Sequence, residues 1–279
     1  MKTAFIVLTA LLVAWGATPR ALAQPATLVS LFDFAGGVRA TGMGGAFAGL
    51  ADDEQALIYN PAGLALLERL HAHATLQSHL SASSVGGLAG ALPSLGAGVQ
   101  FFGVDGLVRR NDQDEAGEAF GYGQFALLGA GALRLGGFIG VPALNALGVG
   151  LRAKFLSVNT LSGGSGATFA LDPSALWELG RLRFGGVSVE RIRVGAALDN
   201  LGPGIRYGSG HSESLGFGAR LGLSAQVQRV VLAALELNTQ TGLHLGVEYT
   251  LPIQTVGTLA LRTGFHTGNG FTFNLGLGF

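Results

Sequence analysis

The feature that most constrains the fold of this chain is an alternation of apolar residues with small or polar ones. The last alternating segment spans residues 271–279, and its apolar side chains stand at every second position: Phe271, Phe273, Leu275, Leu277 and Phe279. Successive residues of a β-strand point to opposite faces of the sheet. The segment is therefore predicted to be a strand with one apolar face.

The same alternation recurs upstream, in segments bounded by turn residues. Clear examples span residues 147–155, 167–175, 192–198, 215–225, 231–238, 243–249 and 258–266, and weaker ones span 70–80, 85–92, 97–104 and 122–135. Residues 138–144 and 182–189 are a possible further hairpin. We therefore predict an all-β chain of about 12 to 14 antiparallel strands.

The composition indicates that much of the surface does not face water. Hydrophobic residues make up 48% and charged residues 12% of the chain, and the mean hydropathy is +0.45, whereas an average soluble domain is about 25% charged. Beyond the N-terminal run, no uninterrupted apolar stretch reaches the ~18 residues of a membrane helix. We expect a transmembrane antiparallel β-barrel, and the alternative is a soluble β-sandwich or barrel.

The face opposite the apolar one consists mostly of glycine with isolated charged residues. This composition suits a confined lumen better than an open surface. The residues predicted to face the lumen are Arg152, Lys154, Arg220, Glu236, His244, Glu248 and Arg262.

The N-terminus has the pattern of a secretory signal peptide. Lys2 precedes an apolar run over residues 4–15, and the small-residue triplet Ala21-Leu22-Ala23 precedes Gln24. We expect residues 1–23 to be removed on export to a bacterial outer membrane, with an N-terminal membrane anchor as the alternative. In that membrane the longer polar connectors, residues 105–119 and 201–213, would lie outside, and the tight turn at Gln228-Arg229 would lie inside.

Residues 33–68 are glycine-rich and do not alternate. Asp52 or Asp53 can cap a short helix, because a carboxylate accepts hydrogen bonds from the free N–H groups of a first turn. Asn60-Pro61 is expected to end that helix, because the residue before proline avoids the helical conformation. The segment is predicted to be a compact turn-and-helix unit, and the alternative is a plain periplasmic strap.

Three short motifs in this region carry a resemblance to a known family. Residues 39–47 (RATGMGGAF), 51–53 (ADD) and 60–64 (NPAGL) resemble the N-terminal signature of the FadL-like outer-membrane proteins, in the PorV/PorQ branch. The resemblance continues more loosely through the strands to Phe279.

The resemblance implies that residues 24–68 form a plug, or hatch, inside a barrel of residues 69–279. It implies plug or gating roles for Gly42, Gly44, Gly45, Asp52, Asp53, Asn60, Pro61, Ala62 and Gly63, and recognition of Phe279 by the barrel-assembly machinery. FadL-type members conduct hydrophobic molecules, and PorV-type members take part in the secretion of other proteins. The expected partners are outer-membrane lipid and either a small hydrophobic compound or an exported protein.

Other classes of function have little support in the sequence. The formal net charge is zero and no basic run is present, so we expect no nucleic-acid partner. The chain has no cysteine, and no motif groups a nucleophile with a base, so we expect neither an enzyme nor a cofactor. His71, His73 and His79 share one face of a predicted strand, but we expect them to be lumen-facing polar residues rather than metal ligands.

Overall fold

The computed structural model describes residues 31, 36–79, 83–160, 164–253, 257–267 and 272–278. The predicted signal peptide and Phe279 lie outside these ranges. The described chain is all-β, as the alternation predicted, and its strands form one antiparallel sheet.

Within these ranges the sheet has 14 strands, 12 of which follow one another in chain order. These are β1 (His71–His79), β2 (Ser83–Leu92), β3 (Leu95–Arg110), β4 (Ala116–Arg134), β5 (Leu147–Asn159), β6 (Gly166–Phe184), β7 (Val187–Asp199), β10 (Gly218–Val227), β11 (Val231–Asn238), β12 (Gly242–Ile253), β13 (Gly257–His266) and β14 (Thr272–Gly278). The short strands β8 (Ile205–Tyr207) and β9 (Ser212–Glu213) pair with each other, and β8 also pairs with β6. Each of the twelve predicted segments overlaps one strand of the main path.

Residues 138–144 do not form a strand, so the further hairpin suggested for residues 138–144 and 182–189 is wrong. They belong to the helix α5 (Leu135–Ile139) and the 3₁₀ turn η2 (Pro142–Leu144). Gly140 ends α5 with a φ of 73°, and Pro142 has no N–H group to donate to a strand neighbour. Residues 182–189 are the hairpin end of β6 and β7 rather than an additional pair.

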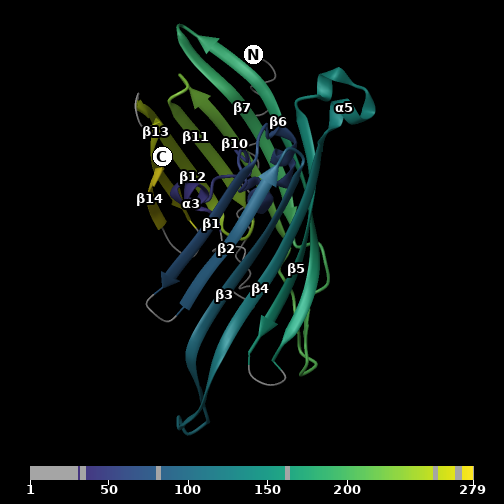
Figure 1. Ribbon diagram of the computed structural model, residues 1–279, viewed down its shortest axis with the longest axis vertical. Helices are drawn as coiled ribbons and strands as arrows, with labels where there is room; N and C mark the ends of the chain where they lie inside the picture. The colour runs from purple at the N-terminus through teal and green to yellow at the C-terminus, as the bar shows by residue number, and fades with distance from the viewer. Residues whose placement is uncertain are drawn as a thin grey trace, which may run out of the picture.

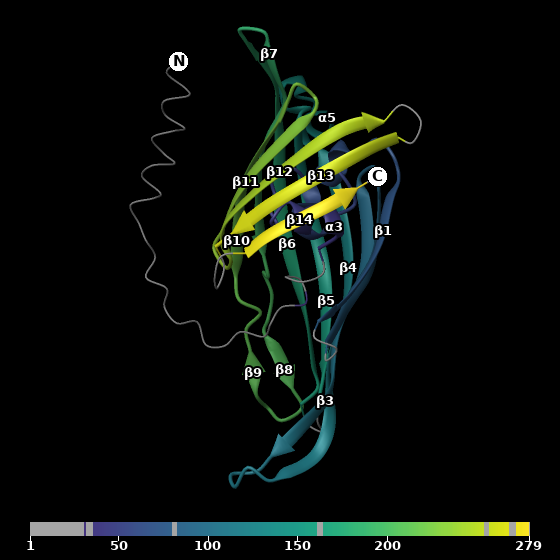
Figure 2. The same cartoon turned by 90° about the vertical axis from the view of Figure 1, so that its left-hand side faces the viewer.

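The connections differ at the two ends of the sheet. The β3–β4 hairpin and the β8–β9 pair lie at one end, and the β6–β7 and β10–β11 turns lie at the other, which we call the short-turn end (Figures 1 and 2). Gln228 and Arg229 have φ values of 51° and 60°, as a tight turn that follows the twist of its strands requires.

Burial of the side chains is inverted relative to a soluble sheet. Along β12, Leu245, Val247 and Tyr249 are exposed, whereas His244 and Glu248 between them are buried. The same alternation is present in β5, β6, β7, β10 and β11. The apolar face is therefore the outer one, and the polar, glycine-rich face is the inner one.

The sheet curves around the N-terminal segment, which lies on its inner side (Figure 1). Helix α3 (Val38–Gly42) contacts β13 and β14, whereas the 3₁₀ helix η1 (Pro61–Leu66) contacts β3 to β6, and α4 (Ala56–Tyr59) lies between them in the chain. Strands β1 and β14 are the two edges, and no ladder joins them among the described residues. None of the helices in the described ranges combines the length and hydropathy needed to cross a bilayer.

Candidate functional site

The candidate site is the contact between residues 36–68 and the inner face of the sheet. Glycines on the strands let the two backbones touch. A Cβ atom added at Gly195 would overlap the carbonyl oxygen of Ala48, and one added at Gly264 would overlap the backbone of Gly44. Side chains at these positions would therefore push the segment away from the sheet.

These glycines are aligned across neighbouring strands. Gly195 of β7 is opposite Gly222 of β10, and Gly246 of β12 is opposite Gly264 of β13. A Cβ at Gly222 or Gly246 would also overlap the backbone of the segment. The glycine-rich face predicted to line a lumen is thus a seat for a second layer of backbone, on β7 and β10 and again on β12 and β13.

The predicted plug glycines lie in this contact. Gly44 and Gly45 have φ values of 66° and 79°, a conformation that residues with a Cβ rarely adopt. Gly42 is buried at the end of α3. Gly63 approaches Ala51 so closely that a Cβ there would overlap the Ala51 carbonyl oxygen.

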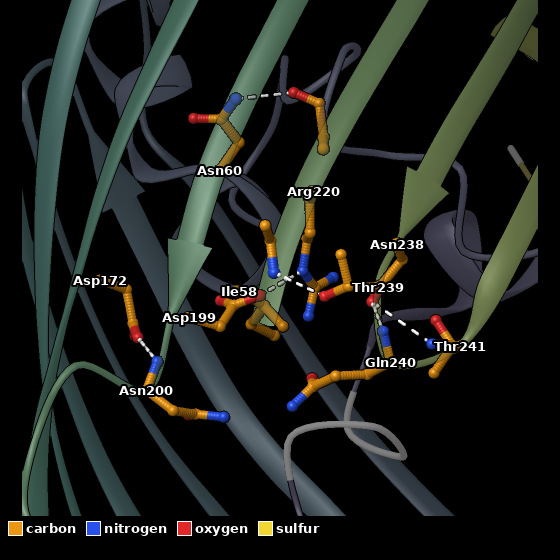
Figure 3. Close-up of polar contacts among 12 residues, drawn as sticks. Ile58, Asn60, Asp172, Asp199, Asn200, Arg220, Asn238, Thr239, Gln240 and Thr241 are labelled. Atoms are coloured by element: carbon orange, nitrogen blue, oxygen red, sulfur yellow. Dashed lines mark hydrogen bonds and ion pairs between the residues drawn. The ribbon is translucent and has the colours of Figure 1, made fainter. Parts of the chain in front are cut away.

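Asn60 links two parts of the segment to the sheet. Its amide nitrogen donates to the carbonyl oxygens of Ala48, at 2.7 Å, and of Ala175 on β6, at 3.0 Å. Its side-chain oxygen accepts a hydrogen bond from the backbone N–H of Ala62 at 3.2 Å. Figure 3 shows this side chain pointing away from the charged residues below it.

The predicted helix stop lies at the same place. Helix α4 ends at Tyr59, and Asn60 has an extended conformation with a φ of −157°. Pro61 then opens η1, where its fixed φ suits a first turn. The N-cap of α4 is Gln55 rather than either aspartate, although Asp53 accepts a hydrogen bond from the Gln55 N–H at 2.9 Å.

Arg39 is the main charged link between the segment and the sheet. Its guanidinium lies 2.5 Å from Asp52 and 2.7 Å from Asp53, and it forms two hydrogen bonds to Glu248, at 3.0 and 3.2 Å. Glu248 is also paired with Arg262 at 2.5 Å. Arg39 was not among the predicted site residues, although it is the only charged residue in the first resembling motif.

The pKa values of the two aspartates differ because of this arrangement. Burial raises the pKa of Asp53 to about 6, against the attraction of Arg39 and with the help of the nearby Asp52 and Glu54 charges. Burial acts in the same direction on Asp52, but Arg39 and Arg193 hold its pKa below the usual range. Asp53 is therefore the carboxyl group of this cluster that a mild change of pH affects first.

A second charged cluster lies on the inner face, on neighbouring strands. Arg152 is paired with Asp172 at 2.6 Å and with Asp199 at 3.1 Å, and Lys154 is paired with Asp172 at 3.0 Å. Arg220 is paired with Asp199 at 2.6 Å, an arrangement visible in Figure 3. The three basic residues were predicted to face the lumen, whereas the two aspartates were not, although they alternate with apolar residues in the same way.

This second cluster also holds the segment directly. The guanidinium of Arg152 donates to the carbonyl oxygen of Leu57 at 3.0 Å and to that of Ile58. These carbonyls belong to α4, which is too short to satisfy them internally. Arg193, also missed, donates to the carbonyl oxygen of Leu50 at 3.0 Å and is paired with Glu178 at 2.8 Å. Its sequence signal was the same alternation with apolar neighbours.

Glu236 and His244 contact the backbone of the segment. Glu236 is 0% exposed and accepts hydrogen bonds from the N–H groups of Phe47, at 3.0 Å, and Ala48, at 2.8 Å. His244 Nδ1 lies 2.7 Å from the carbonyl oxygen of Gly44. Because a carbonyl only accepts, Nδ1 must carry the proton of this hydrogen bond.

The space left beside these contacts is small and polar. A cavity of about 150 Å³ lies next to Arg39. Its lining consists of Arg39, Leu50, Asp52, Arg191, Arg193, Ser224, Gln226, Leu232 and Glu248. The inner face at this level is therefore closed by the segment.

The histidines of β1 contact the segment through one carboxylate. His73 Nδ1 lies 2.9 Å and His71 Nδ1 lies 3.9 Å from Glu54, and the side chain of His79 lies outside the described part. Among the described residues, no group of three or more His, Asp or Glu side chains is arranged to hold a metal ion.

The arrangement brings together nearly all the predicted residues that the structure describes. The predicted plug residues lie in or beside the contact, and all seven predicted lumen residues lie on the inner face of the sheet. The site holds a short segment in place through hydrogen bonds, ion pairs, backbone packing and the burial of apolar side chains such as Phe47, Leu57 and Leu64. No protein-family model and no curated protein matches this sequence.

Proposed function

We propose that this chain is a FadL-like outer-membrane protein that conducts small hydrophobic compounds past an N-terminal plug. In this proposal the twelve strands of the main path close into a barrel, and residues 24–68 are the plug. The observation that carries the proposal is the inverted burial, with an apolar outer face and a charged, glycine-rich inner face that holds a folded segment.

Three physical arguments support a closed barrel in a membrane. The outer face exposes large apolar side chains such as Leu245, at 42%, on strands of the length that crosses a bilayer. Because the main path has an even number of antiparallel strands within the described ranges, β14 runs antiparallel to β1 and can pair with it. An unpaired edge in lipid would leave backbone N–H and C=O groups without partners.

The plug in this proposal is closed, and its contacts are of a kind that can be exchanged. Buried ion pairs contribute little net stability, because desolvation offsets much of their attraction. The segment is also packed by large apolar side chains, such as Phe47, Leu57 and Leu64, which are buried against the strands. A local shift that exchanges ion pairs and keeps this packing therefore costs less than release of the whole segment. The pairs of Arg39 and Arg152 are the contacts that must rearrange first.

A hydrophobic compound suits the other half of the inner face. Towards the β3–β4 hairpin, Val85, Val158 and Ile205 belong to one buried apolar cluster, against which Phe102 and Tyr122 pack. Leu31 is buried in the same cluster, and its N–H donates to Gln124 at 3.1 Å. Leu57, Ile58 and Leu64 of the plug belong to the same cluster, so the proposed route runs through an apolar region that the closed plug fills in part.

The second candidate is a PorV-like function, in which the barrel docks exported proteins and its interior stays shut. The filled inner face around Asn60 favours it, as does exposed apolar surface on α5, where Phe138 is 75% exposed. Transport remains our first proposal because docking alone does not require a segment whose charged contacts with the strands can be exchanged.

The test compares wild type with the double variant Asn60→Gly/Pro61→Gly in the outer membrane of a bacterial host. Glycine at both positions removes the Asn60 hydrogen bonds and the fixed φ of Pro61, while the strands are unchanged. We expect faster uptake of a fluorescent hydrophobic dye and higher sensitivity to small antibiotics at matched protein levels. The same uptake by both proteins and by a host with the empty vector would overturn transport and favour docking.

A further inference from the structure

The β6–β7 hairpin extends past the neighbouring strands at the short-turn end (Figures 1 and 2). Its turn is Gly185-Gly186, with φ values of 52° and 92°. Every residue from Leu179 to Val187 is exposed. The hairpin therefore presents both of its faces beyond the body of the sheet.

The two faces of this hairpin differ in chemistry. Leu182 pairs with Val189 and Phe184 pairs with Val187, and side chains directly opposite each other share a face. The apolar side chains thus form one face. Arg181 and Arg183 alternate with them and occupy the other.

The basic face continues the inner face of the sheet. Arg183 is opposite Ser188, and Glu190, two residues further along β7, is opposite Gln226 of β10. Gln226 lines the small cavity beside the segment, together with Arg191 and Arg193. The arginines of the hairpin therefore form a track that leads from this cavity outward along the hairpin.

Three of these arginines lack a close acidic partner in the described part of the chain, although Arg181 acts electrostatically on Glu190 and Arg191 on Asp52. Within the part of the chain that the structure describes, no carboxylate lies within 4.0 Å of Arg181, Arg183 or Arg191. By contrast, Arg193 is paired with Glu178, and Arg229 with Glu190. Arg191 also has a φ of 49° at an irregularity in the β7–β10 pairing. Arginines without a close ion pair, gathered on one face, create a positive potential that attracts a ligand of opposite charge.

We propose that this arginine track is a docking surface for an extended acidic segment of another protein. Arg181 and Arg183 lie two positions apart on one strand, a spacing of about 7 Å, which matches alternate side chains of an extended peptide. A small anion would need arginines that converge on one point, whereas these lie along a line. Lipid headgroups are less suited, since the apolar face of the hairpin is the one that continues the outer face. In the orientation of the proposed function, the short-turn end faces the periplasm. The partner is then a periplasmic protein, and this part of the inference rests on the proposed function.

The test uses the full chain in nanodiscs of phosphatidylcholine and measures binding by fluorescence anisotropy. The probe is a labelled twelve-residue peptide with glutamate at every second position, and its control has glutamine at those positions. We expect the glutamate peptide alone to bind, more weakly as salt is raised. The variant Arg181→Gln/Arg183→Gln should weaken binding about tenfold, because two exposed ion pairs are lost.

The matched control is Arg109→Gln/Arg110→Gln, at the exposed tip of the β3–β4 hairpin at the opposite end. It should bind the peptide like wild type, and an equal loss in both variants would overturn the proposal. Displacement of the peptide by an equal concentration of inorganic phosphate would overturn it in favour of a small-anion site. If Arg181→Gln/Arg183→Gln lost affinity for phosphatidylglycerol vesicles but bound the peptide like wild type, the proposal would be overturned in favour of a lipid site. Selective peptide binding by a chain that does not insert into membranes would leave this inference standing and refute the proposed function.

Discussion

The guanidinium of Arg39 and the carboxylate of Glu248 lie 3.0 Å apart, although 209 positions separate them in the sequence. This ion pair joins α3 to β12, on the inner face of the sheet. Arg39 also contacts Asp52 and Asp53. One side chain therefore connects the start and the middle of residues 36–68 to the inner face of β12.

Arg39→Gln is expected to loosen the attachment of residues 36–68 to the sheet. Removal of one member of a largely buried charge cluster leaves the others uncompensated. The cost is at most about 3 to 5 kcal/mol, the value for a fully buried pair, because the side chain of Arg39 is 20% exposed. Limited proteolysis of the folded protein in detergent should show faster cleavage within the segment. Arg69→Gln is the control, since Arg69 is exposed and directly follows the same segment. Equal cleavage of the two variants would contradict the role of Arg39.

Gly264→Ala is expected to disturb the same contact through sterics alone. The added methyl group would overlap the backbone of Gly44, and overpacking of this kind typically costs about 1 to 3 kcal/mol. Gly103→Ala is the matched control, because no atom lies within 4 Å of the Cβ position there. Urea unfolding in detergent should show a lower midpoint for the first variant only. Indistinguishable midpoints would argue against close backbone packing at β13.

Leu245→Arg tests whether the outer face meets lipid. A charge near the middle of a bilayer costs about 2 to 4 kcal/mol on the lipid face of a barrel, so insertion should fall sharply. Val108→Arg is the control, because Val108 is equally exposed, at 45%, but lies in the projecting part of the β3–β4 hairpin. Gly246 is unsuitable as an inner-face control, because a side chain there would overlap Met43. Equal yields of heat-modifiable protein in the membrane fraction would count against the proposed barrel.

Asp53 should make the stability of the fold depend on pH. Its folded-state pKa of about 6 lies above the ordinary value of 3.8, so the folded state favours the protonated carboxyl group. The stabilisation from this protonation is fully present below about pH 4 and is lost as the pH rises through about 6. The free energy of unfolding falls by at most about 1.4 kcal/mol per pH unit in this range.

Urea unfolding of wild type and Asp53→Asn at pH 4.5, 6 and 7.5 measures this effect. In wild type, Asp53 lowers the free energy of unfolding as the pH rises from 4.5 to 7.5. Asp53→Asn should lack this part of the decrease. Asp112→Asn, in an exposed turn, should retain it. If Asp53→Asn follows the wild-type profile, the raised pKa is not a property of this carboxyl group.

The sequence by itself determined the elements of the fold that depend on neighbouring residues. Alternation with a period of two located the twelve strands of the main path, because a pleated backbone turns successive side chains to opposite faces. The stop of α4 before Pro61 follows from a local steric conflict in the same way. Residues 138–144 were misread because a short apolar run does not distinguish a strand from a helical turn.

Only the tertiary structure decided which inner-face residues meet the segment. Asp172, Asp199 and Arg193 alternate with apolar neighbours as Arg152 does, and the pattern alone does not show which basic side chain faces which acid. The contact of Gly264 with Gly44 joins parts of the chain that are more than 200 positions apart. Such pairs depend on how the whole sheet curves around residues 36–68, whereas the periodicity of a strand reflects only the conformation of the residues within it.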